Sequence, residues 1–143
     1  MRKYVVAYLV TLIVMVLIDA VWLSTMADLL YRPAIGDMLA PEFRLVPAVI
    51  FYLIYPVGLV FLAVRPAFNQ GSLQVAILSG AVMGFTAYAT YDLTNQATLI
   101  RWSTALTIAD LCWGTFLSAI ASGAGYRVTA RLLRMSIHKE VGR

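Results

Sequence analysis

The chain has 143 residues, of which 62% are hydrophobic and only 13% are charged. Because soluble domains carry about 25% charged residues, this composition excludes an ordinary water-soluble fold, and the length fits a single domain. The net charge of +4 does not require a nucleic-acid partner, since a basic tail after a membrane helix is explained by membrane orientation and by anionic lipid headgroups.

Four apolar runs follow one another along the chain, each close to the about 20 residues that cross a bilayer. Backbone groups in lipid must form their hydrogen bonds within their own segment, so we predict that all four runs are helices. The sequence therefore predicts an all-α fold, a four-transmembrane-helix bundle that forms one membrane domain over residues 1–143. The expected helices cover residues 4–26, 46–64, 73–99 and 104–125.

The first run also has features of a signal peptide, since Arg2 and Lys3 precede it and residues 25–27 resemble a cleavage site. The apolar part of a signal peptide usually has about 7–15 residues. This run continues past Trp22, so we expect it to be retained as a transmembrane helix.

The connections and small residues indicate how the helices pack. Residues 27–45 form the longest connection, for which we expect a short helix on the outer membrane surface. Pro56 lies inside the second helix, where it removes one backbone hydrogen bond and favours a kink. Gly80 and Gly84 form a small-residue pair that favours close helix packing, either within the bundle or in a dimer.

A basic helical tail is expected over residues 126–143, after the fourth helix. Eight basic residues lie at the N-terminus, in the second connection and in the tail, and three lie on the opposite side. The positive-inside rule therefore predicts that both termini are cytoplasmic, with the tail near anionic headgroups. The eight are Arg2, Lys3, Arg65, Arg127, Arg131, Arg134, Lys139 and Arg143, and the three are Arg32, Arg44 and Arg101.

Three acidic residues, Asp19, Asp92 and Asp110, lie inside the predicted spans. An Asp at the bilayer centre costs about 2.5–3.5 kcal/mol, so the fold must offset this cost. Counted from the expected outer helix ends (Met26 for the first helix), Asp19 and Asp92 lie seven residues deep and Asp110 six. All three carboxyl groups are thus predicted roughly 10 Å below the outer surface, in one polar layer.

Hydrogen-bond donors and aromatic residues accompany these acids. Trp22, Asn95 and Trp113 each follow an acid by three residues and so share its helix face. We expect Trp22 and Trp102 to be anchors at the membrane interface, and Trp113 to pack in the bundle or line a pocket. Tyr52 and Tyr55 fall at a matching depth, and Tyr88 lies one turn before Asp92. The predicted ligand-binding residues are Asp19, Trp22, Tyr52, Tyr55, Tyr88, Asp92, Asn95, Asp110 and Trp113.

Three segments together resemble a bacterial membrane family catalogued as a domain of unknown function, DUF2177. They are LIDAVWL at 17–23, YDLTNQATLIRW at 91–102 and DLCWG at 110–114. The resemblance spans nearly the whole chain and implies a compact multi-pass protein of the bacterial inner membrane, without a settled activity. It implies that the motif residues correspond to Asp19, Trp22, Asp92, Thr94, Asn95, Trp102, Asp110 and Trp113.

The main functional hypothesis is a site that binds, and in its fuller form transports, a cation, a proton or a small polar solute. Intramembrane acids commonly mark such pathways, and aromatic walls attract organic cations. Asp19 and Asp110 would supply charge, with Asp92 and Asn95 as coordinating groups. Because four helices enclose little volume, a transporter of this size suggests a homodimer.

One alternative is an enzyme that acts on outer-leaflet lipids or lipid-linked substrates, with paired carboxyl groups as general acid and base. Arg101 would then hold a phosphate headgroup. The only histidine, His138, lies in the tail and the only cysteine is Cys112, so we expect no haem, di-iron or zinc site and no Ser-His-Asp triad. Carboxylates alone still suit Ca²⁺ or Mg²⁺.

The other alternative is a structural or accessory subunit. In that case the acids are protonated or hydrogen-bonded braces that fix the register of the helices, each contributing about 0.6–2 kcal/mol.

Overall fold

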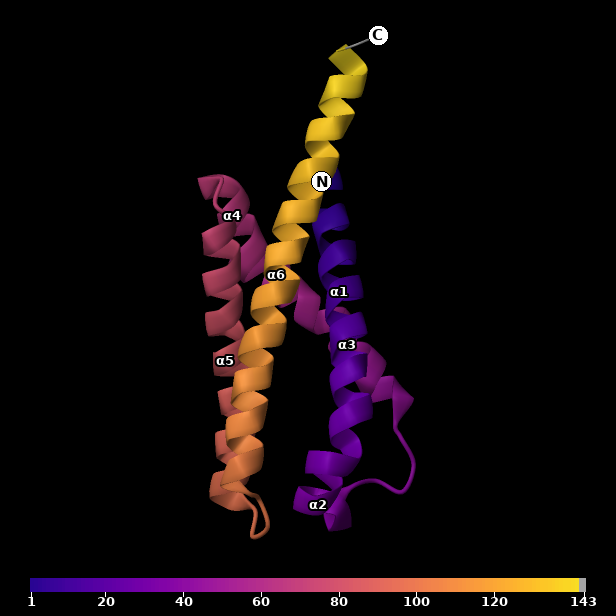
Figure 1. The fold of residues 1–143 in the computed structure, drawn as a ribbon, viewed down its shortest axis with the longest axis vertical. Helices are drawn as coiled ribbons and strands as arrows, with labels where there is room; N and C mark the ends of the chain where they lie inside the picture. The colour runs from indigo at the N-terminus through magenta and orange to yellow at the C-terminus, as the bar shows by residue number, and fades with distance from the viewer. Residues whose placement is uncertain (142–143) are drawn as a thin grey trace.

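The computed structural model describes the backbone of residues 1–141 and the side chains of residues 1–134. Within these residues the chain is helical, without strands. Four helical stretches are long and apolar enough to cross a membrane, which confirms the predicted all-α bundle of four membrane-spanning helices (Figure 1). They cover Arg2–Met38, Leu45–Gln70, Leu73–Thr98 and Thr104–Arg134. Both termini lie at one end of the bundle, and the opposite end is called the distal end below (Figure 1).

The first helix continues beyond its expected end. Helix α1 (Arg2–Met26) leads directly into a π-helical turn, η1 (Ala27–Tyr31), and then into α2 (Arg32–Ile35) and a 3₁₀ turn, η2 (Gly36–Met38). No glycine or proline occurs between Tyr4 and Arg32, so nothing in this stretch stops a helix. These helical turns at the distal end of α1 occupy the first part of the expected outer connection (Figure 1).

The second span crosses the bundle from the side of α1 to the side of α5 (Figure 1). It consists of α3 (Leu45–Leu59), a π-helical turn η3 (Val60–Val64) and α4 (Arg65–Gln70). The α-helical geometry continues through Pro56, and the irregular turn begins four residues later. Gly71 ends the span with φ +63°, a left-handed conformation that glycine adopts at little cost.

The third and fourth spans, α5 (Leu73–Thr98) and α6 (Thr104–Val141), pack closely against each other. A Cβ atom added at Gly80 would lie 2.6 Å from the carbonyl oxygen of Ser118, and one at Gly84 would meet the backbone of Gly114. The small-residue pair thus serves packing within the bundle.

Helix α6 continues beyond the rest of the bundle at the end that carries the termini, so the basic tail is a helical extension as far as Val141 (Figure 1). The side chains of His138, Lys139 and Arg143 lie outside the described residues.

The buried core follows the axis of the bundle, and its outside is apolar. One cluster contains Met15, Tyr55 and Leu117, and a second, nearer the termini, contains Ala7 and Val64. Many large apolar side chains point outward, as expected for a protein whose surroundings are lipid. In a bundle with such an apolar exterior, the few buried acids need a physical explanation.

Candidate functional site

Asp19 connects three helices. It is only 5% exposed, its Oδ2 accepts a hydrogen bond from the Tyr52 hydroxyl at 2.6 Å, and its Oδ1 accepts one from the Trp113 indole at 2.8 Å. Tyr52 lies on α3 and Trp113 on α6. Because both carboxyl oxygens have donors, Asp19 is satisfied within the bundle, as a brace would be.

Asp110 has a different donor, which the sequence patterns did not reveal. The Tyr31 hydroxyl donates to Asp110 Oδ1 at 2.6 Å and accepts a hydrogen bond from the Trp22 indole at 3.1 Å. Tyr31 is the last residue of the π-helical turn that continues α1. The one sequence feature that indicated this continuation was the lack of a helix-ending glycine or proline before Pro33.

The two indoles of the D-x-x-W motifs stack on each other. The rings of Trp22 and Trp113 have centroids 4.2 Å apart and planes inclined by 8°. Because α1 and α6 are antiparallel, Trp22 lies distal to Asp19 while Trp113 lies on the other side of Asp110, so the rings meet between the two acids. Trp22 is thus a packing residue in the bundle, and its role as an interface anchor stays a prediction.

Each D-x-x-W indole is hydrogen-bonded toward the acid of the other helix. Trp113 donates directly to Asp19, and Trp22 donates to Tyr31, which donates to Asp110. The other predicted anchor, Trp102, lies near the turn between α5 and α6 and donates to the Thr107 hydroxyl at 3.1 Å.

The acids occupy two levels. The Trp22–Trp113 stack and the contact of Thr11 with Gly125 fix the antiparallel register of α1 and α6. In this register Asp110 is offset from Asp19 by about 9 Å toward the distal end. The depth count placed Asp19 level with Asp110 because it took Met26 as the outer end of the first helix. The helix continues beyond that residue, and the two acids are not level.

Asp92 lies at the distal level, near Asp110. The register of α5 and α6 follows from the packing of the Tyr88 ring on Gly114 and of Gly80 on Ser118. It places Asp92 within about one helical turn of Asp110 along the bundle axis. The two side chains are close enough for their charges to repel each other.

Asp92 has no partner for either carboxyl oxygen. The residue is 0% exposed, and within the part of the chain whose side chains are described neither Oδ1 nor Oδ2 has a hydrogen-bond partner. A buried charge without a partner is costly, so an ionised Asp92 would need a counter-ion or a polar ligand. This isolated carboxyl group is the chemically unusual feature of the bundle.

The remaining predicted residues have supporting positions. The Tyr55 hydroxyl is 2.8 Å from the Ser118 hydroxyl, a buried partner that the sequence analysis did not identify. The Tyr88 hydroxyl is within electrostatic range of Asp19 and Asp110. Asn95 is half-buried on α5, one turn beyond Asp92. The Thr94 hydroxyl donates to backbone carbonyls of its own helix.

A line of buried hydroxyl groups continues from the acids toward the termini. Ser118, Ser122 and Thr129 are 0% exposed along α6, and Thr11 is equally buried on α1. The hydroxyl oxygens of Thr11, Ser122 and Thr129 have no partner among the described residues. Together with the Tyr55–Ser118 pair they give the interior a polar path that the acids alone do not provide.

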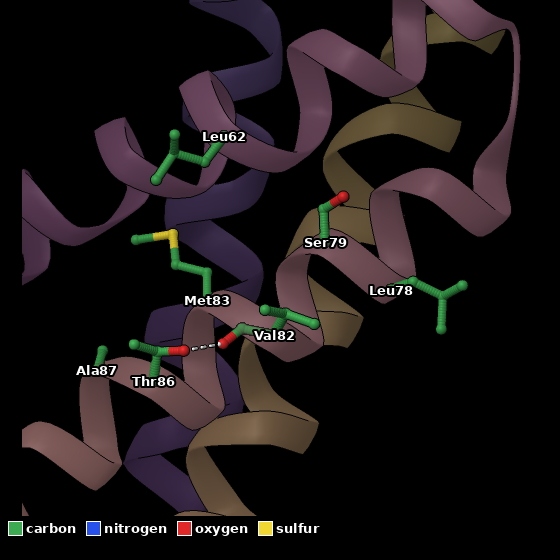
Figure 2. A pocket seen from close by; sticks show the side chains of 7 residues that line it. All are labelled: Leu62, Leu78, Ser79, Val82, Met83, Thr86 and Ala87. Atoms are coloured by element: carbon green, nitrogen blue, oxygen red, sulfur yellow. Dashed lines mark hydrogen bonds between the residues drawn. The ribbon is translucent and has the colours of Figure 1, made fainter.

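The groove in Figure 2 has a different character. It has a volume of about 620 Å³, and the Thr86 hydroxyl in it donates to the Val82 carbonyl at 2.9 Å (Figure 2). The lining is otherwise mainly hydrocarbon, which suits a lipid chain and offers no charge. It is formed by Leu62, Leu78, Ser79, Val82, Met83, Thr86 and Ala87.

The geometry limits metal and phosphate binding at the distal end. Among the described side chains, no three His, Cys, Asp or Glu residues are grouped so that they could hold a metal ion. Arg101, the predicted phosphate ligand, forms an exposed ion pair with Asp37 at 2.7 Å.

Comparison with known proteins identifies the family. No curated protein and no solved structure matches the chain. A family of predicted membrane proteins, DUF2177, matches it over residues 4–127, a range that contains the second and third apolar spans and most of the first and fourth. The chain is therefore an integral, multi-pass membrane protein that belongs to the DUF2177 family.

Proposed function

We propose that this protein binds a small cation, foremost a proton, at Asp92 and Asp110 and conducts it through the bundle. The observation that carries the proposal is the buried Asp92 carboxyl group, which has no hydrogen-bond partner among the described residues and lies within about one helical turn of Asp110 along the bundle axis. Two neighbouring carboxylates in a dry interior cannot both keep a full charge at low cost. A shared proton or cation removes both the repulsion and the unpaired charge.

The surroundings favour a small ligand over a large one. The facing surfaces of the Trp22 and Trp113 rings cover each other, so no cage between them is open to an organic cation. Asp19 is occupied by Tyr52 and Trp113 and supports the architecture. This favours a role as a brace for Asp19, and leaves the distal pair as the binding groups.

Conduction is supported by the buried hydroxyl line. Ser118 and Ser122 on α6 lie about 6 Å apart along the axis, a distance that one intervening water can bridge. Thr11 of α1 packs against Gly125, between the levels of Ser122 and Thr129. Hydroxyl groups both donate and accept hydrogen bonds, which is what a proton path needs. The enzyme alternative has less support, because Arg101 is paired with Asp37 and the acids are 5% exposed or less.

We place the termini in the cytoplasm of a bacterium and the distal end outside the inner membrane. The basis is the excess of basic residues at the end that carries the termini. Cations would then enter the distal level from outside.

Infrared difference spectroscopy on the protein in lipid nanodiscs tests the binding site. We expect a pH jump to produce the band of a protonated carboxyl group, and Asp92→Asn to remove it. Asp37→Asn, which changes an exposed carboxylate at the same end, serves as the matched control. Exchange of Na⁺ for K⁺ at constant pH shows whether a metal cation competes. A wild-type protein without any Asp92-dependent carboxyl signal in either experiment contradicts the proposal.

A further inference from the structure

A basic cavity lies at the end of the bundle that carries the termini, far from the acids. It has a volume of about 300 Å³ and lies where the turn between α4 and α5 meets α6. We call it the arginine pocket. Its lining residues are Gly71, Leu73, Tyr126, Arg127, Ala130, Arg131 and Arg134.

The three arginines of the pocket share one helix face. Arg127, Arg131 and Arg134 are spaced by four and three residues, so they project on the same side of α6. The lining contains no acidic residue, and the two ion pairs among the described residues involve other arginines, Arg32 and Arg101. Guanidinium groups present a planar fork of donors that matches the oxygens of a phosphate.

The beginning of α5 adds a second attractive feature to the same cavity. Gly71 turns the chain with φ +63°, Ser72 caps the helix, and Leu73, its first residue, lines the pocket. The first backbone N–H groups of a 26-residue helix have no partner within the helix and carry partial positive charge. Anions are stabilised at such a position.

The depth of the pocket selects a lipid over a soluble anion. Leu73 is the first residue of the third apolar span, so we place the pocket at the edge of the hydrocarbon layer, next to the lipid phosphates. Leu73 and Ala130 add apolar surface beside the arginines, on which the glycerol and the first acyl carbons can rest.

From this combination we infer that the arginine pocket binds the phosphate group of an anionic membrane lipid. This inference does not depend on the proposed cation site, because it concerns other residues at the opposite end of the bundle.

Native mass spectrometry of the full chain with phosphatidylglycerol and phosphatidylcholine tests this inference. We expect one phosphatidylglycerol to be retained in preference to phosphatidylcholine, and Arg131→Gln to weaken its binding about tenfold, the loss of one charge-assisted contact. Arg131→Lys keeps the positive charge but removes the paired N–H donors of the guanidinium group, so it should also weaken lipid binding. Arg101→Gln, at the distal end, is the matched control and should bind as the wild type does.

Two results would overturn the inference. The first is phosphatidylglycerol binding that is unchanged in Arg131→Gln and in the triple variant Arg127→Gln/Arg131→Gln/Arg134→Gln, with circular dichroism showing that both variants are folded. The second is displacement of the lipid by inorganic phosphate at equal concentration, which would make the pocket a site for free phosphate.

Discussion

Asp19 and Asp92 are both buried aspartates on membrane helices, but their surroundings differ in a way that affects stability. Asp19 accepts hydrogen bonds from Tyr52 and Trp113, whereas Asp92 has no donor among the described residues. A hydrogen bond to a charged group contributes about 1.5–3 kcal/mol in water-soluble proteins, and a buried polar group without a partner costs about 1–3 kcal/mol. Replacing the two acids by an apolar residue should therefore have opposite consequences.

We expect Asp19→Leu to lower the free energy of unfolding by about 2–3 kcal/mol, because the Tyr52 hydroxyl and the Trp113 indole lose their acceptor. Asp92→Leu should leave the free energy of unfolding unchanged or raise it. Denaturant unfolding of the purified protein in detergent, in a buffer without alkali or alkaline-earth ions, measures both. If Asp92→Leu were as destabilising as Asp19→Leu, Asp92 would be a second brace and the proposed site would lose its basis.

At the scale of the elements, the distal level depends on a π-helical turn. A π-helical turn contains more residues than an α-helical turn, so η1 changes the direction in which the following side chains project. Tyr31, its last residue, contacts both Trp22 and Asp110. The packing of α5 on α6 depends on a different device, the absence of side chains at Gly80, Gly84 and Gly114.

Gly84→Ala should destabilise the fold by about 1–3 kcal/mol, the usual cost of overpacking. The added Cβ would meet the backbone oxygen of Gly114 and the Ser118 side chain, and the backbone cannot yield as a flexible side chain would. Gly36→Ala is the control, since Gly36 has helical dihedral angles and open space around it. Thermal unfolding followed by circular dichroism compares the two variants. Equal stability of Gly84→Ala and the wild type would contradict the close packing of α5 on α6.

At the scale of the whole molecule, polar groups are distributed along the full length of an apolar bundle. The distal end carries Asp92 and Asp110, the middle carries Asp19 and buried hydroxyl groups, and the end with the termini carries the arginine pocket. The proposed conduction needs the hydroxyl groups, because none of the described intramembrane acids lies at the end that carries the termini.

Proton flux into liposomes that contain the protein, followed with an internal pH-sensitive dye, tests conduction. Asp92→Asn should reduce the flux to that of empty liposomes, because the amide side chain does not take up and release a proton near neutral pH as a carboxyl group does. Ser122→Ala should reduce it strongly by removing a hydroxyl group from the path, whereas Asp37→Asn should conduct as the wild type does. Flux in Asp92→Asn equal to that of the wild type would refute conduction through this site.

The sequence alone determined the fold class and singled out the three intramembrane acids. Whether a segment crosses a membrane depends on its own length and apolar content, and each of the four spans satisfies this local condition. The same local condition makes Asp19, Asp92 and Asp110 conspicuous, since an acid in such a segment is costly wherever it points.

Tertiary structure decided the relative levels of the acids and their hydrogen-bond partners. Asp19 is not level with Asp110, and the continuation of the first helix past Met26 brings Tyr31 to Asp110. The register of α1 and α6 decides which indole is hydrogen-bonded toward which acid. This register relates segments far apart in the chain, so no local sequence pattern contains it. The register of α1 and α6 gives Asp19 its two donors, and the packing of α5 on α6 places Asp92, which has no partner among the described residues, near Asp110.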